Sequence, residues 1–130
     1  MKDGSQALSK VLGLGSAHEG AHHWRTQRLT ALGLLLLGPW LLVSLLLQPD
    51  FEYATLRAWA AGLVNGTLLA LLLIAACWHS QLGVQVVIED YVKGGARMVS
   101  LILSTFVHLL LGALGILSIV RLVLGAPLQG

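Results

Sequence analysis

Residues 58–88, AWAAGLVNGTLLALLLIAACWHSQLGVQVVI, form a run of 31 positions without a single Asp, Glu, Lys or Arg. This length exceeds the roughly 18 apolar residues with which an α-helix can cross the hydrocarbon core of a membrane. Two further uncharged runs, 29–49 and 98–120, meet the same criterion. Charged residues make up only 11% of the chain, against about 25% in soluble domains. The sequence therefore predicts an all-α membrane protein with three transmembrane helices, at about 25–48, 57–89 and 96–121.

The basic residues predict how the chain crosses the membrane. Six of them lie in the N-terminal segment and the second loop: Lys2, Lys10, Arg25, Arg28, Lys93 and Arg97. The first loop and the C-terminal tail hold one each, Arg57 and Arg121. The positive-inside rule then places the N-terminus and the loop 89–97 on the cytoplasmic side. We expect a cytoplasmic tail at 1–24, a transmembrane domain at 25–124 and a C-terminal tail at 125–130. The net charge of +2 follows from this topology and does not indicate a nucleic-acid partner.

His79 is an ionisable residue deep inside the run 58–88, eleven residues before Asp90. With a helical rise of roughly 1.5 Å per residue, it lies about 16 Å from Asp90, near the middle of a hydrocarbon core of about 30 Å. An ionisable side chain at this depth marks a functional site. Imidazole is a common ligand of haem iron, and Gly83, one turn further on the same face, leaves room for a flat macrocycle. We therefore predict that His79 is a haem ligand; a proton relay in a small transporter is the alternative.

Two basic or ionisable side chains lie at the entry to the first helix, on the side where haem propionates would lie. Arg28 sits at the hydrocarbon edge on the side of Asp90, and a guanidinium pairs bidentately with a carboxylate. His22, six residues earlier, can add a second donor. We predict that both contact propionates. For Arg25, and as the alternative for Arg28, the sequence favours interfacial anchoring by a cation that reaches toward the headgroups.

Asp90 and Tyr91 end the second apolar segment, where they can serve as a helix end with an interfacial aromatic residue. A phenol beside a carboxylate at the membrane edge is also suited to hydrogen-bond a quinone carbonyl and to handle its protons. We predict that this pair binds quinone.

Two other patterns allow competing interpretations. His18-Glu19-Gly20-Ala21-His22 matches the H-E-x-x-H pattern of zinc proteases, but Gly20 and the polar tail around it do not favour the stable helix and third ligand that zinc needs. His108 reaches nearly the depth of His79. It is interpreted as hydrogen-bonded to a neighbouring helix, or alternatively as the second ligand of a self-contained cytochrome b.

Two segments carry a resemblance to a known family. Residues 79–93, HSQLGVQVVIEDYVK, resemble the second transmembrane helix of the succinate dehydrogenase hydrophobic membrane anchor subunit family, with its H-x-x-x-G and D-Y-V pattern. Residues 20–31, GAHHWRTQRLTA, are similar to the entry to helix one in that family, G-x-H followed by R-x-T-A.

The resemblance implies an anchor subunit without catalytic residues of its own. It implies that His79 is one axial ligand of haem b, that the other comes from a second membrane-anchor (cytochrome b556) subunit, and that Arg28 approaches a propionate. It further implies that Tyr91 hydrogen-bonds ubiquinone in a pocket lined by Asp90. The expected partners are this second anchor, a flavoprotein subunit with FAD and an iron–sulfur subunit that together oxidise succinate, and membrane lipid. The N-terminal segment shows no signal-peptide core and no presequence, and we expect a multi-pass protein of a bacterial inner membrane.

Overall fold

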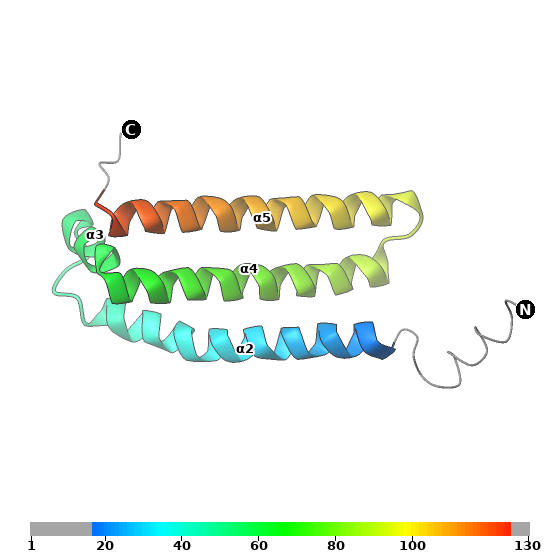
Figure 1. Ribbon diagram of the computed structural model, residues 1–130, viewed down its shortest axis with the longest axis horizontal. Helices are drawn as coiled ribbons and strands as arrows, with labels where there is room; N and C mark the ends of the chain where they lie inside the picture. The colour runs from blue at the N-terminus through cyan, green and yellow to red at the C-terminus, as the bar shows by residue number, and fades with distance from the viewer. Residues whose placement is uncertain (1–16, 126–130) are drawn as a thin grey trace, which may run out of the picture.

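The computed structural model describes residues 17–125, with side chains from Gly20 onward, and every element in this range is a helix. The elements are α2 (Ala17–Leu46), α3 (Tyr53–Ala61), α4 (Leu63–Tyr91) and α5 (Gly95–Val123). The three long helices run side by side, with α4 between α2 and α5 (Figure 1). Each is long and apolar enough to span a membrane, which confirms the predicted class and the three spans.

The helix boundaries differ from the expected ones at two places. The first helix begins at Ala17, so the last eight residues of the tail expected at 1–24 are helical, and it continues through Pro39. The segment expected as one helix at 57–89 is divided into α3 and α4 by Gly62, whose ψ of 134° is not helical. The break places α3 at the end of the bundle (Figure 1).

Side chains near Gly62 stabilise this break. The amide nitrogen of Asn65 donates to the Trp59 carbonyl at 2.9 Å, which also accepts a bond from the Gly62 backbone N–H at 3.3 Å. The Trp59 ring stacks on Trp40 of α2, with centroids 6.1 Å apart. A broken helix leaves carbonyls unpaired, and in a membrane they need a partner within the protein. Asn65 supplies one, which accounts for a polar residue in this apolar run.

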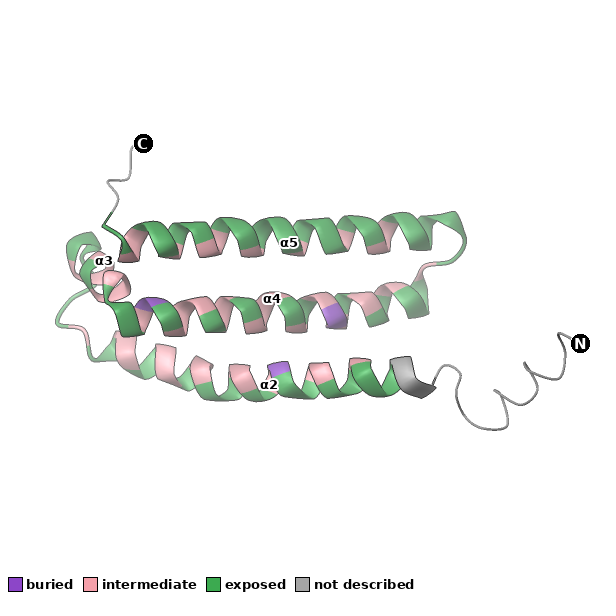
Figure 2. Cartoon of the chain, in the orientation of Figure 1, coloured by how far each residue is buried: buried purple, intermediate pink, exposed green. Residues whose placement is uncertain are grey.

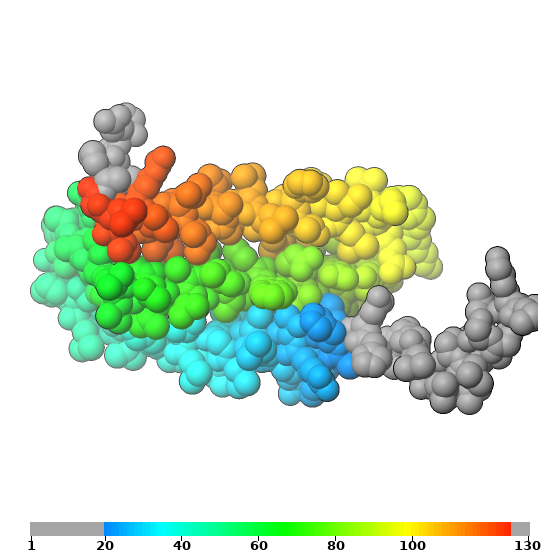
Figure 3. Space-filling view, in the orientation of Figure 1, coloured from blue at the N-terminus to red at the C-terminus, as the bar shows by residue number. Residues whose placement is uncertain are grey.

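The helices pack through small residues while their outer faces stay apolar and exposed. Long green faces on α2 and α5 show how little of the described chain is buried (Figure 2). Between helices that share a lipid solvent, association depends on close packing more than on apolar burial. A Cβ added at Gly66 would meet the Val123 side chain, and one added at Gly115 would meet Leu73. The space-filling view shows the resulting layer, with α4 between its neighbours (Figure 3).

Candidate functional site

A hollow of about 440 Å³ lies between α2 and α4, and His79 is the one residue of α4 that lines it. The other lining residues come from two turns of α2: Trp24, Gln27, Arg28 and Ala31. Their spacing of three, four and seven residues places them on one face of a helix. We call this set the His79 hollow. The structure thus brings together two predicted site residues, His79 and Arg28, that are 51 positions apart in the chain.

The His79 ring is held by a contact from the neighbouring helix. Its Nδ1 lies 3.1 Å from the hydroxyl oxygen of Thr30, which is one of the least exposed polar side chains in the described chain, at 7%. The same hydroxyl lies 3.0 Å from the carbonyls of Thr26 and Gln27, one turn back along α2. The imidazole therefore has one nitrogen engaged with protein, while the ring lines the hollow.

Arg28 lies at the hollow with its charge directed over an aromatic ring. The guanidinium carbon is 5.0 Å from the centroid of Trp24, a cation–π arrangement. In the described part of the chain no acidic side chain pairs with Arg28, because the one ion pair there joins Arg97 to Glu89. The guanidinium is therefore oriented by Trp24, and no described carboxylate competes with an anion that would bind there.

Gly83 leaves space on the face of α4 that carries His79. A Cβ built at this position has no atom within 4 Å, whereas the buried Gly66 of the same helix is tightly enclosed. A flat group bound at His79 would extend along this face without meeting a side chain at position 83. The geometry fits the role predicted for this glycine.

His22, predicted as a second propionate donor, is exposed and does not line the His79 hollow. Its backbone carbonyl accepts a bond from the Thr26 hydroxyl at 2.9 Å, an ordinary contact within the helix. The role predicted for its imidazole stays a prediction.

The last turn of α4 presents two side chains without partners in the described structure. Glu89 accepts a bond from Gln85 at 3.0 Å and lies 4.0 Å from Arg97 across the turn into α5. Asp90 and Tyr91, which end α4, are exposed, Tyr91 to 81%. Glu89 thus interacts with residues at the turn, whereas the Asp90 carboxylate and the Tyr91 phenol, which are predicted to bind quinone, are accessible.

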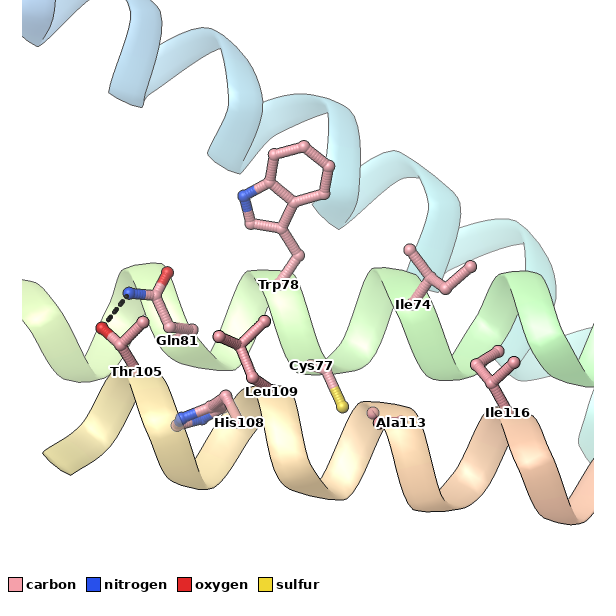
Figure 4. Close-up of a pocket in the computed structure, with 10 residues that line it drawn as sticks. Ile74, Cys77, Trp78, Gln81, Thr105, His108, Leu109, Ala113 and Ile116 are labelled. Carbon is pink, nitrogen blue, oxygen red and sulfur yellow. Dashed lines mark hydrogen bonds between the residues drawn. The ribbon is translucent and has the colours of Figure 1, made fainter. Parts of the chain in front are cut away.

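His108 belongs to a different hollow, of about 460 Å³, between α4 and α5. Figure 4 shows it beside Gln81 and Thr105, which are themselves 3.5 Å apart, with Cys77 on the facing helix. Both ring nitrogens of His108 are engaged, one with the Ser104 carbonyl at 2.8 Å and the other with the Ser80 hydroxyl at 3.1 Å. The interpretation as a histidine bonded to a neighbouring helix is confirmed. The contacts do not favour joint ligation of one group by His79 and His108.

Sequence reasoning did not single out Trp24 or Gln27, and it included Thr30 only as part of the R-x-T-A pattern, without a role of its own. The first two could have been found from their helical spacing with Arg28 and Ala31, which is visible in the sequence. The contact of Thr30 with His79 has no local signal, because it joins two helices. The structure does not test the H-E-x-x-H match, because side chains 18 and 19 lie outside those described. The described residues hold no group of three His, Cys, Asp or Glu that could bind a metal ion.

Comparison with known proteins agrees with the family that the two sequence segments resemble. Residues 2–115 match a family described as succinate dehydrogenase/fumarate reductase transmembrane subunit. A protein of Rickettsia bellii is 36% identical over 86 residues, which is 66% of this chain and 69% of the relative. One of Paracoccus denitrificans is 30% identical over 115 residues, 88% of each chain. Both are named succinate dehydrogenase hydrophobic membrane anchor subunit.

Proposed function

The chain belongs to the family of succinate dehydrogenase/fumarate reductase transmembrane subunits, as a hydrophobic membrane anchor subunit, and from this premise we propose that it binds haem b and helps form a ubiquinone-reduction site. It is a multi-pass membrane protein, and its Rickettsia and Paracoccus relatives fit a bacterial inner membrane. In the proposed complex, electrons from succinate arrive through a flavoprotein and an iron–sulfur protein.

The observation that carries the proposal is the His79 hollow, which combines an imidazole with a guanidinium that pairs with no acidic side chain among those described. A neutral imidazole nitrogen binds haem iron, and a guanidinium pairs with a propionate. When bound, haem b supplies one-electron transfer. His79 would ligate the iron from one side, Arg28 would hold a propionate, and the open space at Gly83 would admit the macrocycle edge.

We propose that the second membrane-anchor subunit would supply the other ligand of the haem. Among the described residues that line the His79 hollow, His79 is the one imidazole, and His108 lies in the other hollow. A second imidazole for the iron would therefore have to come from outside these described lining residues, which a partner chain could supply.

The quinone site is proposed at the end of the bundle where α2 begins, α4 ends and α5 begins (Figure 1). Four of the basic residues lie near this end: Arg25, Arg28, Lys93 and Arg97. The positive-inside rule therefore supports a cytoplasmic position, where the soluble subunits would bind. Tyr91 would donate a hydrogen bond to a quinone carbonyl, and Asp90 would orient the phenol or relay a proton.

The test of this function is purification of the intact complex in mild detergent, followed by an absorption spectrum. We expect a b-type haem spectrum and three co-purifying chains: a flavoprotein, an iron–sulfur protein and a second anchor. A complex with no b-type spectrum would contradict the haem assignment and leave the proton-relay alternative for His79.

Arg28→Leu is expected to lower haem retention in the purified complex, because a propionate loses its cationic partner. Arg25→Leu is the matched control, since Arg25 lies one turn earlier on α2, is exposed and does not line the His79 hollow. The measurement is the ratio of haem to protein after a prolonged wash. If both variants retain haem equally, Arg28 acts as an interfacial anchor and not as a propionate ligand.

A further inference from the structure

We propose that Thr30 is the positioning residue of His79: its hydroxyl accepts the Nδ1–H of the imidazole and so leaves Nε2 as the nitrogen free for iron. This inference rests on the proposed function, because it concerns the same ligand. It assigns a role to a residue on a different helix from the ligand.

The hydrogen-bond partners of Thr30 lead to this assignment. A hydroxyl carries one hydrogen and two lone pairs. The Thr30 hydroxyl has two carbonyls 3.0 Å away, from Thr26 and Gln27, and a carbonyl can only accept. If its hydrogen points to a carbonyl, the oxygen accepts from His79 Nδ1 at 3.1 Å. The imidazole Nδ1–H then donates to the Thr30 hydroxyl, and the hydroxyl hydrogen donates to a carbonyl, so that both hydrogens have an acceptor.

The opposite arrangement is less favourable in a membrane. If Thr30 donated to His79, the imidazole would carry its hydrogen on Nε2. That nitrogen could not bind iron, and its N–H would need a separate acceptor at a depth where water is scarce. Ligation through Nε2 requires Nδ1–H, and the Thr30 hydroxyl is the acceptor within reach of that atom.

The packing of α2 on α4 keeps this contact in place. Gly33, three residues after Thr30, approaches Ala75, four residues before His79, so that a Cβ on Gly33 would lie 3.5 Å from the Ala75 Cβ. Small residues at this crossing allow the backbones to approach closely. The short Thr30 side chain can therefore reach the imidazole and is itself buried, at 7% exposure.

A hydrogen bond from the distal N–H makes an imidazole a stronger electron donor to its metal. This donation stabilises ferric more than ferrous iron. Thr30 is therefore expected to lower the reduction potential of the haem as well as to orient the ring.

The test uses three variants in the purified complex. Thr30→Val removes the hydroxyl at nearly constant shape, and Thr30→Ser keeps it. Thr67→Val removes a hydroxyl that lies 12 positions before His79 and donates to the Leu63 carbonyl of its own helix. In Thr30→Val we expect the equilibrium between ferric and ferrous haem to shift roughly tenfold toward the ferrous form. This shift raises the reduction potential of the haem by about 59 mV. Thr30→Ser and Thr67→Val are expected to keep the wild-type potential and the same electron paramagnetic resonance signal.

The outcomes separate this inference from the proposed function. Loss of axial ligation in His79→Ala tests the haem assignment by itself. If that variant loses ligation while Thr30→Val keeps the wild-type potential and resonance signal, the role of Thr30 is overturned and the function stands. A second measurement needs no substitution at Thr30: the ¹⁵N resonances of the His79 ring in haem-depleted wild-type complex. A protonated Nδ1 supports the proposal, and a protonated Nε2 overturns it.

Discussion

We expect His79→Ala to abolish the ligation signal of the proposed b-type haem in the purified complex, while the chain still inserts in the membrane. The substitution removes the one imidazole among the described residues that line the His79 hollow, and methyl groups do not bind iron. Insertion is preserved because alanine suits an apolar helix better than histidine does. The measurement is the reduced-minus-oxidised spectrum per complex, with the amount of chain in the membrane determined on the same sample.

His108→Ala is the matched control for this experiment. It is the other histidine in a long apolar span, but its contacts are to Ser104 and Ser80 in the other hollow. We expect it to cost about 0.5–1.5 kcal/mol of stability per hydrogen bond lost and to leave the haem signal intact. Loss of the signal in His108→Ala with retention in His79→Ala would reverse the assignment of the ligand.

Tyr91→Phe is expected to cut quinone reduction on the order of 100-fold, the cost typical of removing one donor that stabilises a developing negative charge. The change deletes one hydroxyl from an exposed side chain and leaves its shape nearly unaltered. Oxidation of succinate with an artificial acceptor at the soluble subunits is expected to survive, because that reaction does not reach the end of α4. The two rates are measured on the same preparation.

Tyr53→Phe is the natural control, since Tyr53 is the other tyrosine, is 67% exposed and lies at the opposite end of the bundle. It should alter neither rate. Equal loss of both activities in Tyr91→Phe would mean that the substitution disrupts assembly. Normal rates in both assays would remove Tyr91 from the quinone site.

The sequence predicted the spans well and their interruptions poorly. The runs 29–49, 58–88 and 98–120 are visible because lipid excludes charge along the whole length of a helix, so composition alone reports a span. The helix break at Gly62 cannot be recognised from composition. The Gly62 backbone is extended, a conformation open to any residue, and the break persists because Asn65 and the Trp40–Trp59 stack support it. These contacts come from three helices.

The depth of His79 and the family pattern around it were determined by the sequence alone, since depth follows from counting residues along a helix and the pattern is local. The direction in which the imidazole points was decided only by tertiary structure. His79 and His108 reach similar depths by count, yet one faces α2 and the other bridges α5 to α4. Helical rise sets height, whereas rotation about the axis is set by the close packing of small residues such as Gly33 and Ala75. This packing brings Thr30 and Arg28 to His79, and no pattern within a single helix contains that contact.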